Sequence, residues 1–460
     1  MGADASRTLI ASGREPAASA AIVEVHGRRV VEFAIEGGKH HGAIGEAGGE
    51  VVERAVHLAV AQGIPIVGRF DTSGADIREG VSALHAWGRI AKALADASGV
   101  VPTVIAVTGA CVSGPSLVLG LVDAVVMTAA AFAYVSGPDS VTEFTGVAVD
   151  NDALGGAPVH DRESGVAAIV VADADAALDA CHAILDYLPD NNLADAPSFH
   201  PDDVIDRACT QARAIVPDRP NAPYDVRDVL ADVLDTDSVL ELRANYASNV
   251  VTALARLGGR SVGIIANQPA FRAGTLDIEA SRKAARFVQW CDAFNLPILT
   301  FVDTPGFEPG RDLEWRGMIR HGAQLVQAYG EATVPRLCVV LRKAYGGAYI
   351  VMDSRGLGND WACAWPNAEI AVMGAAGAVQ ILHRKRLLAI DDPAERARVE
   401  AELVAEYEER FSNPYQAAER GFIDEVVDPL DTRRALAEAL ANLATKKERL
   451  PRRRHANGPL

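Results

Sequence analysis

Short apolar runs and longer segments of helical spacing alternate along the chain. Runs of branched apolar residues bounded by Gly, Pro or Asp indicate buried strands, and apolar residues three or four apart indicate amphipathic helices. Strands are predicted at residues 22–35 (a pair), 64–70, 103–107, 261–267, 296–302 and 336–341, and helices at 49–62, 80–97, 278–294 and 315–330. Strands that alternate with helices predict an α/β fold with mainly parallel pairing.

The same order of elements occurs twice, because the chain contains an internal duplication. Four residues of the first predicted strand pair recur 232 positions later: Gly27, Arg28, Val30 and Ala34 become Gly259, Arg260, Val262 and Ala266. The same offset relates 65–74 to 297–306, and one inserted residue then relates Gly114 to Gly347. Composition alone does not produce so many identities in one register, so we infer two copies of one module.

The two modules set the predicted domain boundaries. Residues 1–200 form the first domain, and residues 224–460 form the second. The second includes a polar helix at 392–410 and a basic, solvated tail at 452–454. Between the domains, residues 188–223 are rich in Pro, Asp and Asn, which is typical of a connector.

Composition and charge argue against several classes of function. The chain has 44 Lys and Arg against 61 Asp and Glu, and its net charge of −17 disfavours nucleic acid as a partner. The apolar stretch 100–135 is interrupted by Pro and Gly, which indicates buried elements and no membrane interaction. Six scattered cysteines without zinc-site spacing predict a cytoplasmic protein with no metal. The pattern from Gly2 to Ser6 resembles a myristoylation signal, but so short a pattern often arises by chance.

The candidate chemistry lies in two turns of small residues at equivalent places in the two modules. Each turn follows a predicted buried strand and opens a helix, which leaves backbone N–H groups free to bind a developing oxyanion. The second turn is 346–348 (GGA), and the first is 113–115 (SGP), where the proline has no N–H. If only one of these turns were present, a purely structural tight turn would be the favoured interpretation. Two such turns at equivalent positions favour a functional role.

Two strand-end aspartates, Asp71 and Asp303, are candidates for a general base. Asp followed by Thr and Gly also forms a side-chain-capped turn, and we favour this structural role. No Ser-His-Asp set, Walker lysine loop or His-x-x-x-His motif is recognised. Two oxyanion sites without an obvious acid or base indicate a reaction in which the substrate or cofactor supplies the base.

Longer motifs resemble a known family. Residues 73–79 (SGADIRE) resemble the oxyanion loop of the crotonase superfamily. The whole chain is similar to the carboxyltransferase (beta) subunit of biotin-dependent acyl-CoA carboxylases, of the acetyl- or propionyl-CoA carboxylase type. The matching segments, in chain order, are 71–80 (DTSGADIREG), 136–139 (SGPD), 154–156 (LGG), 164–166 (SGV), 224–227 (YDVR), 303–306 (DTPG), 342–349 (RKAYGGAY) and 371–375 (AVMGA).

The resemblance implies two tandem crotonase-like (ClpP/crotonase) domains, the first for acyl-CoA and the second for carboxybiotin, with the site completed across a subunit contact. It implies that the amides of Ser113 and Gly114 hold the acyl enolate, and that those of Gly347 and Ala348 hold the ureido oxygen of biotin. Biotin that has lost CO2 is the implied base. The implied substrate-binding residues are Gly74, Ala75, Gly137, Gly346, Tyr349, Ile350, Gly374 and Ala375.

The resemblance also implies partners. Members form rings of six beta subunits with a separate alpha subunit that carries biotin carboxylase and the biotin. Acyl-CoA is then the substrate of this chain, and no metal is required. The position of Ile350 lines the acyl pocket in the family, where Ile accompanies acetyl-CoA and Asp propionyl-CoA, so acetyl-CoA is favoured and propionyl-CoA is possible.

Three departures from the family pattern fall in the first module. The usual Gly-Gly-Ala is Ser-Gly-Pro at 113–115, the usual Asp-Ser-Gly-Gly is Asp-Thr-Ser-Gly at 71–74, and the N-terminal region is shorter. Two alternatives stay open: a biotin-independent acyl-CoA decarboxylase of crotonase type, and a non-catalytic assembly subunit of a carboxylase complex, which the altered first turn would favour.

Overall fold

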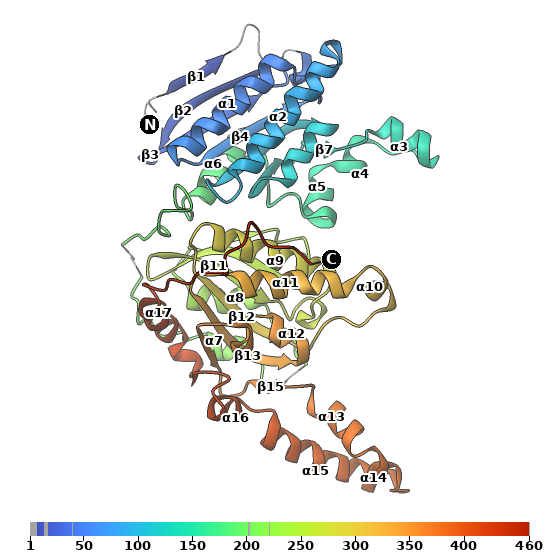
Figure 1. Ribbon diagram of the computed structural model, residues 1–460. Coiled ribbons are helices and arrows are strands. Elements are labelled where there is room, and N and C mark those ends of the chain that lie inside the picture. The colour runs from blue at the N-terminus through green and yellow to red at the C-terminus, as the bar shows by residue number, and fades with distance from the viewer. Residues whose placement is uncertain (1–6, 13–16, 39, 201–202, 220, 460) are drawn as a thin grey trace. The chain divides into compact units, whose positions relative to one another are not determined.

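The computed structural model describes residues 7–12, 17–38, 40–200, 203–219 and 221–459, which form two compact units (Figure 1). Unit 1 contains the chain up to Pro197 together with Leu242–Tyr246 and Ala293–Asn295. Unit 2 contains Ser198–Glu241, Ala247–Asp292 and Leu296–Leu460. The pattern from Gly2 to Ser6 lies outside the described residues. No helix in the described part of the chain is long and apolar enough to cross a bilayer.

Unit 1 is built on a sheet with the strand order β1-β2-β3-β4-β5-β6-β8, and β7 pairs with the end of β5. Strands β1 to β3 pair antiparallel, and the pairs from β3 onward are parallel. The strands are β1 (Thr8–Ser12), β2 (Ala18–Val25), β3 (Arg28–Ile35), β4 (Ile66–Thr72), β5 (Thr103–Val112), β6 (Ala124–Thr128), β7 (Phe132–Tyr134) and β8 (Ile169–Val171). The helices are α1 (Glu46–Gln62), α2 (Val81–Ala97), the 3-10 helix η3 (Gly114–Gly120), α3 (Pro138–Thr145), α4 (Asn151–Gly155), α5 (Ala157–Val159) and α6 (Ala174–Leu185).

Unit 2 repeats this arrangement. Its sheet has the order β9-β10-β11-β12-β13-β14-β16, and β15 pairs with the end of β13. The strands are β9 (Leu240–Leu242), β10 (Val250–Leu257), β11 (Arg260–Asn267), β12 (Ile298–Thr304), β13 (Arg336–Tyr345), β14 (Trp361–Ala364), β15 (Glu369–Ala371) and β16 (Glu425–Val426). The helices are α7 (Ala212–Ile215), α8 (Val226–Val233), α9 (Ile278–Ala293), α10 (Arg311–Trp315), α11 (Met318–Glu331), α12 (Gly346–Val351), α13 (Ala375–Leu382), α14 (Arg384–Leu388), α15 (Pro393–Phe411), α16 (Pro414–Glu419) and α17 (Thr432–Asn442).

The duplication extends to strand register. Ile66 pairs with Thr103 in unit 1, and the equivalent Ile298 pairs with Arg336 in unit 2. Both pairings are interrupted by a bulge after the same strand position, at Phe70/Thr72 and at Val302/Thr304. The predicted α/β fold of two duplicated modules is therefore confirmed.

Two features differ from the sequence prediction. Residues 198–223, expected within a connector, pack into unit 2, where Cys209 and Ala212 are fully buried. Helices α13, α14 and α15 form an arm that projects from the rest of unit 2 (Figure 1) and has its own small core of Val379, Leu387, Val399 and Leu403. The polar helix predicted at 392–410 is α15, which begins after the capping side chain of Asp392.

Candidate active site

The two small-residue turns lie at equivalent places, directly after β5 and directly after β13. The first residue of each turn has a positive φ, which is 64° at Ser113 and 57° at Gly346. Short helices begin within both turns: η3 starts at Gly114 in unit 1, and α12 starts at Gly346 in unit 2. The positive φ at this position is therefore kept in both copies, although only the second copy has glycine there.

The first turn offers fewer donors than the sequence suggests. The Ser113 N–H donates to the carbonyl oxygen of Tyr134 at 2.9 Å, so this amide is not available to an enolate. Pro115 has no N–H, which leaves the Gly114 amide, for which no acceptor is found among the described residues. Strand pairing between β5 and β7 thus engages the Ser113 amide, and the predicted role of the Ser113 and Gly114 amides stays a prediction.

A second free amide comes from the loop after β4. Ile44 N–H donates to Gly74 O at 2.8 Å and Asp76 N–H donates to Ile44 O at 3.0 Å, which leaves Ala75 N–H without an acceptor in the described chain. A side chain added at Gly74 would lie 3.1 Å from the Ser113 Cβ, so the loop and the turn are in close contact. The amides of Ala75 and Gly114 are thus the available donors on this side of unit 1.

Ser113 stores backbone strain. With φ 64° and ψ −156° it occupies a region that is nearly restricted to glycine and costs other residues about 1–3 kcal/mol. We expect Ser113→Gly to raise the free energy of unfolding by about 1 kcal/mol, since relief of strain outweighs the added chain entropy. Chemical denaturation measures this change in the free energy of unfolding. Ser136, exposed and without a positive φ, is the control, and Ser136→Gly should not stabilise. A less stable Ser113→Gly protein would contradict the assigned strain.

The second turn contains one exposed and one buried residue after Gly346. Gly347 is exposed, whereas Ala348 is fully buried. These residues lie in the first turn of α12, whose N-terminus has no side-chain cap, so their N–H groups have no intrahelical acceptor. Further along α12, Ile350 is 45 % exposed, and burial raises the pKa of the Tyr349 hydroxyl above its ordinary value.

Two predicted glycines begin the helices that flank the turns. Gly137 is the N-cap of α3 and Gly374 is the N-cap of α13, directly before Ala375. Tyr345, the residue before the second turn, lies close to Gly374, because a Cβ there would be 3.4 Å from its ring. The predicted site residues of each unit therefore gather around the end of β5 or the end of β13.

The strand-end aspartates support the fold. Asp71 accepts a hydrogen bond from Ala110 N–H at 3.1 Å, and the equivalent Asp303 accepts one from Lys343 N–H at 3.2 Å. The turn at 71–74, which follows β4, is capped by a threonine and not by the aspartate, since Gly74 N–H donates to the Thr72 hydroxyl at 3.1 Å. The structural role favoured from sequence fits this geometry, although each carboxylate braces the neighbouring strand and does not cap its own turn.

Asp303 belongs to a buried charge cluster that the sequence did not reveal. Its carboxylate accepts hydrogen bonds from Arg342 Nε and from the Tyr224 hydroxyl, both at 2.9 Å. Burial raises the pKa of Asp303, although Arg342 and Lys343 oppose the rise. Arg342 and Tyr224 both fall in matched motifs, but no local pattern shows that residues so far apart meet.

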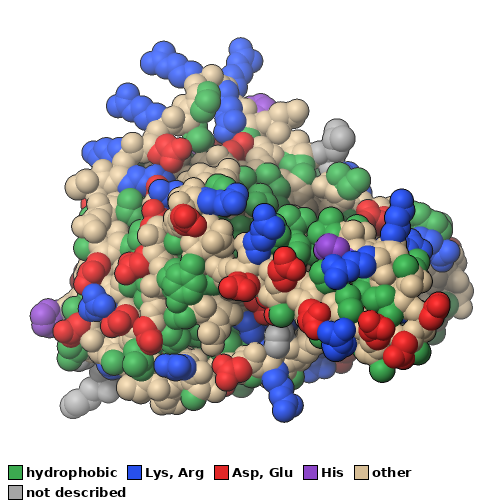
Figure 2. Space-filling view, turned by 90° about the horizontal axis from the view of Figure 1, so that it is seen from below, with side chains coloured by type: hydrophobic (Ala, Val, Ile, Leu, Met, Phe, Trp, Pro, Cys, Tyr) green, Lys and Arg blue, Asp and Glu red, His purple; other side chains and the backbone are tan. Residues whose placement is uncertain are grey.

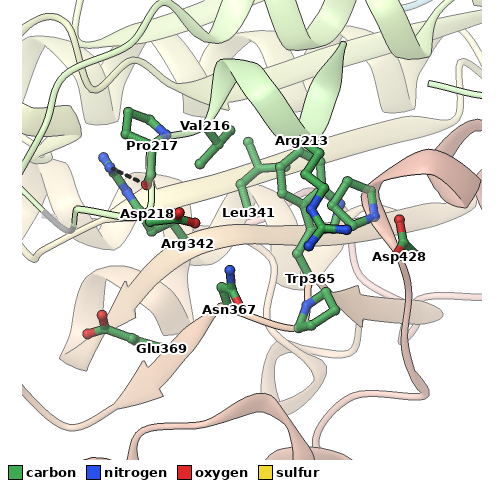
Figure 3. A pocket seen from close by; sticks show the side chains of 12 residues that line it. Arg213, Val216, Pro217, Asp218, Leu341, Arg342, Trp365, Asn367, Glu369 and Asp428 are labelled. Carbon is green, nitrogen blue, oxygen red and sulfur yellow. Dashed lines mark hydrogen bonds between the residues drawn. The ribbon is translucent and has the colours of Figure 1, made fainter. Parts of the chain in front are cut away.

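A pocket in unit 2 adjoins this cluster (Figure 3). Arg213 and Trp365 line one side, and Asp218, Arg342 and Glu369 lie on the other. None of the predicted site residues lines it. In the described part of the chain, no group of three or more His, Cys, Asp or Glu could hold a metal ion.

The fold defines a class: a duplicated crotonase-like α/β protein with a turn of small residues at the equivalent place in each module. The chain belongs to the Carboxyl transferase domain family, whose model matches residues 13–458. It is an enzyme, a carboxyltransferase of the acyl-CoA carboxylase family. The predicted family and enzyme class are thereby confirmed.

Named relatives cover nearly the whole chain. The carboxyltransferase subunit of propionyl-CoA carboxylase from Haloferax mediterranei is 47% identical over 438 residues, 95% of this chain and 84% of the relative. The alpha subunit of methylmalonyl-CoA decarboxylase from Propionigenium modestum is 41% identical over 437 residues, again 95% of this chain and 84% of the relative. The hexameric transcarboxylase 12S, solved with methylmalonyl-CoA and methylmalonic acid bound, matches with a TM-score of 0.93 and 43% identity, over 96% of this chain and 84% of the solved one.

Proposed function

We propose that this chain transfers a carboxyl group from carboxybiotin, carried by a separate subunit, to the α-carbon of a short acyl-CoA. The observation that carries the proposal is the pair of equivalent turns, each with an amide free to bind an oxygen. A cytoplasmic location is part of the proposal, supported by six free cysteines, all buried.

The free amides fit the charges that this reaction develops. Loss of the α-proton places negative charge on the thioester oxygen, and the Ala75 and Gly114 amides would stabilise it on the acyl-CoA side. The Gly347 and Ala348 amides would hold the ureido oxygen of biotin. Bound carboxybiotin would supply the carboxyl group and, once that is lost, the base. This chain then needs no ionisable base, which agrees with the structural roles of Asp71 and Asp303.

The proposed partners are an alpha subunit with biotin carboxylase and the biotin carrier, and further copies of this chain. The hexameric state of transcarboxylase 12S, a protein of the same fold, supports a homo-oligomer, and we propose a hexamer.

Two observations favour different lengths for the acyl group of the substrate. Ile350, exposed beside the second turn, favours acetyl-CoA by family resemblance. The relatives are named for propionyl-CoA and methylmalonyl-CoA, which favours a three-carbon acyl group. We propose that the substrate is acetyl-CoA or propionyl-CoA. A competition assay with both substrates present would show which of the two is carboxylated faster.

The reverse half-reaction tests the proposal without the alpha partner. Purified protein is incubated with malonyl-CoA or methylmalonyl-CoA, with and without biocytin, and acetyl-CoA or propionyl-CoA is measured. A carboxyltransferase forms product only when biocytin is present. Product without biocytin would indicate the biotin-independent decarboxylase. No product, together with co-purification with an active paralogue, would indicate an assembly subunit.

Ile350→Asp should change the acyl preference. We expect the ratio of kcat/KM for propionyl-CoA over acetyl-CoA to rise about tenfold, because one methylene in a pocket is worth roughly 1–3 kcal/mol. The matched control is Ile319→Asp on α11, whose side chain is 81 % exposed. An unchanged ratio of kcat/KM in Ile350→Asp would show that this side chain does not line the acyl pocket.

A further inference from the structure

Helix α12, which begins in the second turn, is followed by a buried ion pair. Asp353 lies shortly after the end of α12, and its carboxylate accepts a hydrogen bond from Arg336 Nη1 at 2.7 Å. The Asn359 side chain donates to the same carboxylate at 3.0 Å. Arg336 also donates to the carbonyl oxygen of Leu357 at 3.3 Å. The start of β13 therefore holds the loop 353–359 that follows α12.

The residues on either side of Asp353 are bonded back to α12. Met352 N–H donates to Ala348 O at 3.0 Å, and Ser354 N–H donates to Ile350 O at 3.3 Å. Ala348 carries one of the proposed donors to biotin, and Ile350 is the side chain proposed for the acyl pocket. A shift of Asp353 would therefore be passed directly to both residues.

Both charges of the pair are buried, unlike the acidic and basic side chains interspersed on the face shown in Figure 2. Arg336 is 3 % exposed and Asp353 is 0 % exposed. Desolvation of two charges offsets most of their attraction, so a buried ion pair adds little net stability. The loss of one partner is nevertheless costly, because the other charge then stays buried without compensation. Such a pair therefore favours one arrangement of the groups around it.

The first module folds without this pair. Thr103 occupies in β5 the place that Arg336 occupies in β13. Thr103 N–H donates to the Asp123 side chain at 2.9 Å, and Arg336 N–H donates to the Asp360 side chain at 2.8 Å, so both modules share this contact at the strand start. Threonine has no charge, so the ion pair is an addition in unit 2. The fold of the module does not require it, and it occurs in the unit whose turn exposes Gly347.

We infer that Asp353 is a positioning residue for carboxyl transfer, because its pair with Arg336 fixes α12 and thereby the amides of Gly347 and Ala348. The inference rests on the proposed function, in which these amides hold the ureido oxygen of biotin. Asp353 is fully buried, so it acts through α12 and not by contact with a substrate. Small displacements of groups that position a substrate lower the rate strongly, by up to about a hundredfold for 1 Å.

The pair also predicts a pH dependence. Burial raises the pKa of Asp353 to about 6, although Arg336 and Asn359 oppose the rise. The carboxyl is therefore ionised at pH 8 and largely protonated at pH 5, where its ion pair with Arg336 is lost. The other titratable or charged groups that interact with this carboxyl are Tyr329, Cys338, Asp360 and Lys446. Burial raises the pKa values of the first two well above their ordinary values, so both stay neutral in this range, and the last two form an ion pair at 2.8 Å.

Asp353→Asn tests the inference in the biocytin-dependent formation of acetyl-CoA from malonyl-CoA. The substitution keeps the size of the side chain and removes its charge. At pH 8 we expect kcat to fall about tenfold, while the KM for malonyl-CoA stays nearly constant. The ratio of the wild-type rate to the variant rate should approach one as the pH falls to 5, with a midpoint near the pKa of Asp353, about 6. The ratio cancels any pH dependence of the substrates.

The matched control is Asp235→Asn, which breaks another buried pair of unit 2, that of Asp235 with Arg433. The groups that donate to this carboxylate, on Gly258, Gly259 and Arg433, belong neither to α12 nor to the loop 353–359. Its kcat should therefore match that of wild type at each pH, even if its melting temperature is lower. A folded Asp353→Asn protein with wild-type kcat at pH 8, or with a rate ratio that does not change with pH, would overturn the inference.

A second variant and a second measurement cover the other outcomes. If Asp353→Asn does not fold, Arg336→Lys replaces it, because lysine keeps the charge and loses the forked contacts; its kcat should fall about threefold, and an unchanged kcat would overturn the inference. Hydrogen exchange of the α12 amides does not depend on activity and should be faster in Asp353→Asn than in wild type or Asp235→Asn. Equal exchange in all three would overturn the positioning role. Absence of biocytin-dependent product from the wild-type protein would instead refute the proposed function itself.

Discussion

Replacing Gly347 with valine should lower the rate of carboxyl transfer about 100- to 1000-fold, the range measured when one oxyanion donor is lost. Gly347 does not have a positive φ, and an added Cβ would lie 3.6 Å from the Phe307 ring, which is ordinary contact. The backbone therefore accepts a side chain, while the branched methyl groups cover the exposed amide. The biocytin-dependent formation of acetyl-CoA or propionyl-CoA measures the effect, and the melting temperature should change little.

Gly330→Val is the matched control for this prediction. Gly330 lies on α11, and no atom is within 4 Å of an added Cβ, so activity should be retained. Gly114 is a poorer choice for the same test, because a Cβ there would lie 2.9 Å from the Trp87 ring and disturb the packing of α2. Full activity in Gly347→Val would show that the second turn does not take part in carboxyl transfer.

Arg342→Met should destabilise unit 2 by about 3–5 kcal/mol, because it removes the cation that is hydrogen-bonded to the buried Asp303 carboxylate. Arg342 is only 5 % exposed, and it also donates to the carbonyl oxygens of Arg219 and Ala222 at 3.0 and 2.9 Å. Removing the guanidinium therefore also leaves backbone acceptors unsatisfied. Urea unfolding measures the loss. Adding Asp303→Asn should restore part of the stability, since the carboxylate that lost Arg342 is then no longer charged.

The destabilisation should depend on pH. Burial already raises the pKa of Asp303 in the folded protein, and loss of Arg342 removes a group that lowers it. A carboxyl whose pKa is higher in the folded state binds more protons when folded, so the variant should gain stability relative to wild type as the pH falls from 8 to 5. The control is Arg398→Met, which breaks an exposed pair with Glu402 and should cost less than about 1 kcal/mol at either pH. An equally small loss in Arg342→Met would refute the structural role of the pair.

Much of the fold could be predicted from the sequence, because its signals are local and repeated. The centre of strand β13, residues 337–341, is a continuous apolar run, and the helix predicted at 49–62 is the structure's α1 (Glu46–Gln62). Because of the duplication, each of these patterns occurs in both modules, which shows that the turns at 113–115 and 346–348 occupy equivalent positions. The turns were found for the same reason, since small residues after a buried strand are visible without any knowledge of contacts.

The available donors could not be predicted in this way. Ser113 and Gly114 are adjacent, yet one amide binds the carbonyl oxygen of Tyr134, twenty-one residues after Ser113, and the other is free. The contribution of Ala75 depends on a bridge between its loop and Ile44. The capping of the turn by Thr72, where aspartate was expected, likewise follows from how the strand end meets its neighbour.

The sequence by itself determined the class of fold, its duplication and the places where main-chain donors gather, since these follow from apolar periodicity and from small residues within single elements. The tertiary structure alone decided which amides are free and which carboxylates are buried. The physical reason is that a hydrogen bond or an ion pair joins groups far apart in the chain, and their meeting is set by strand pairing and packing.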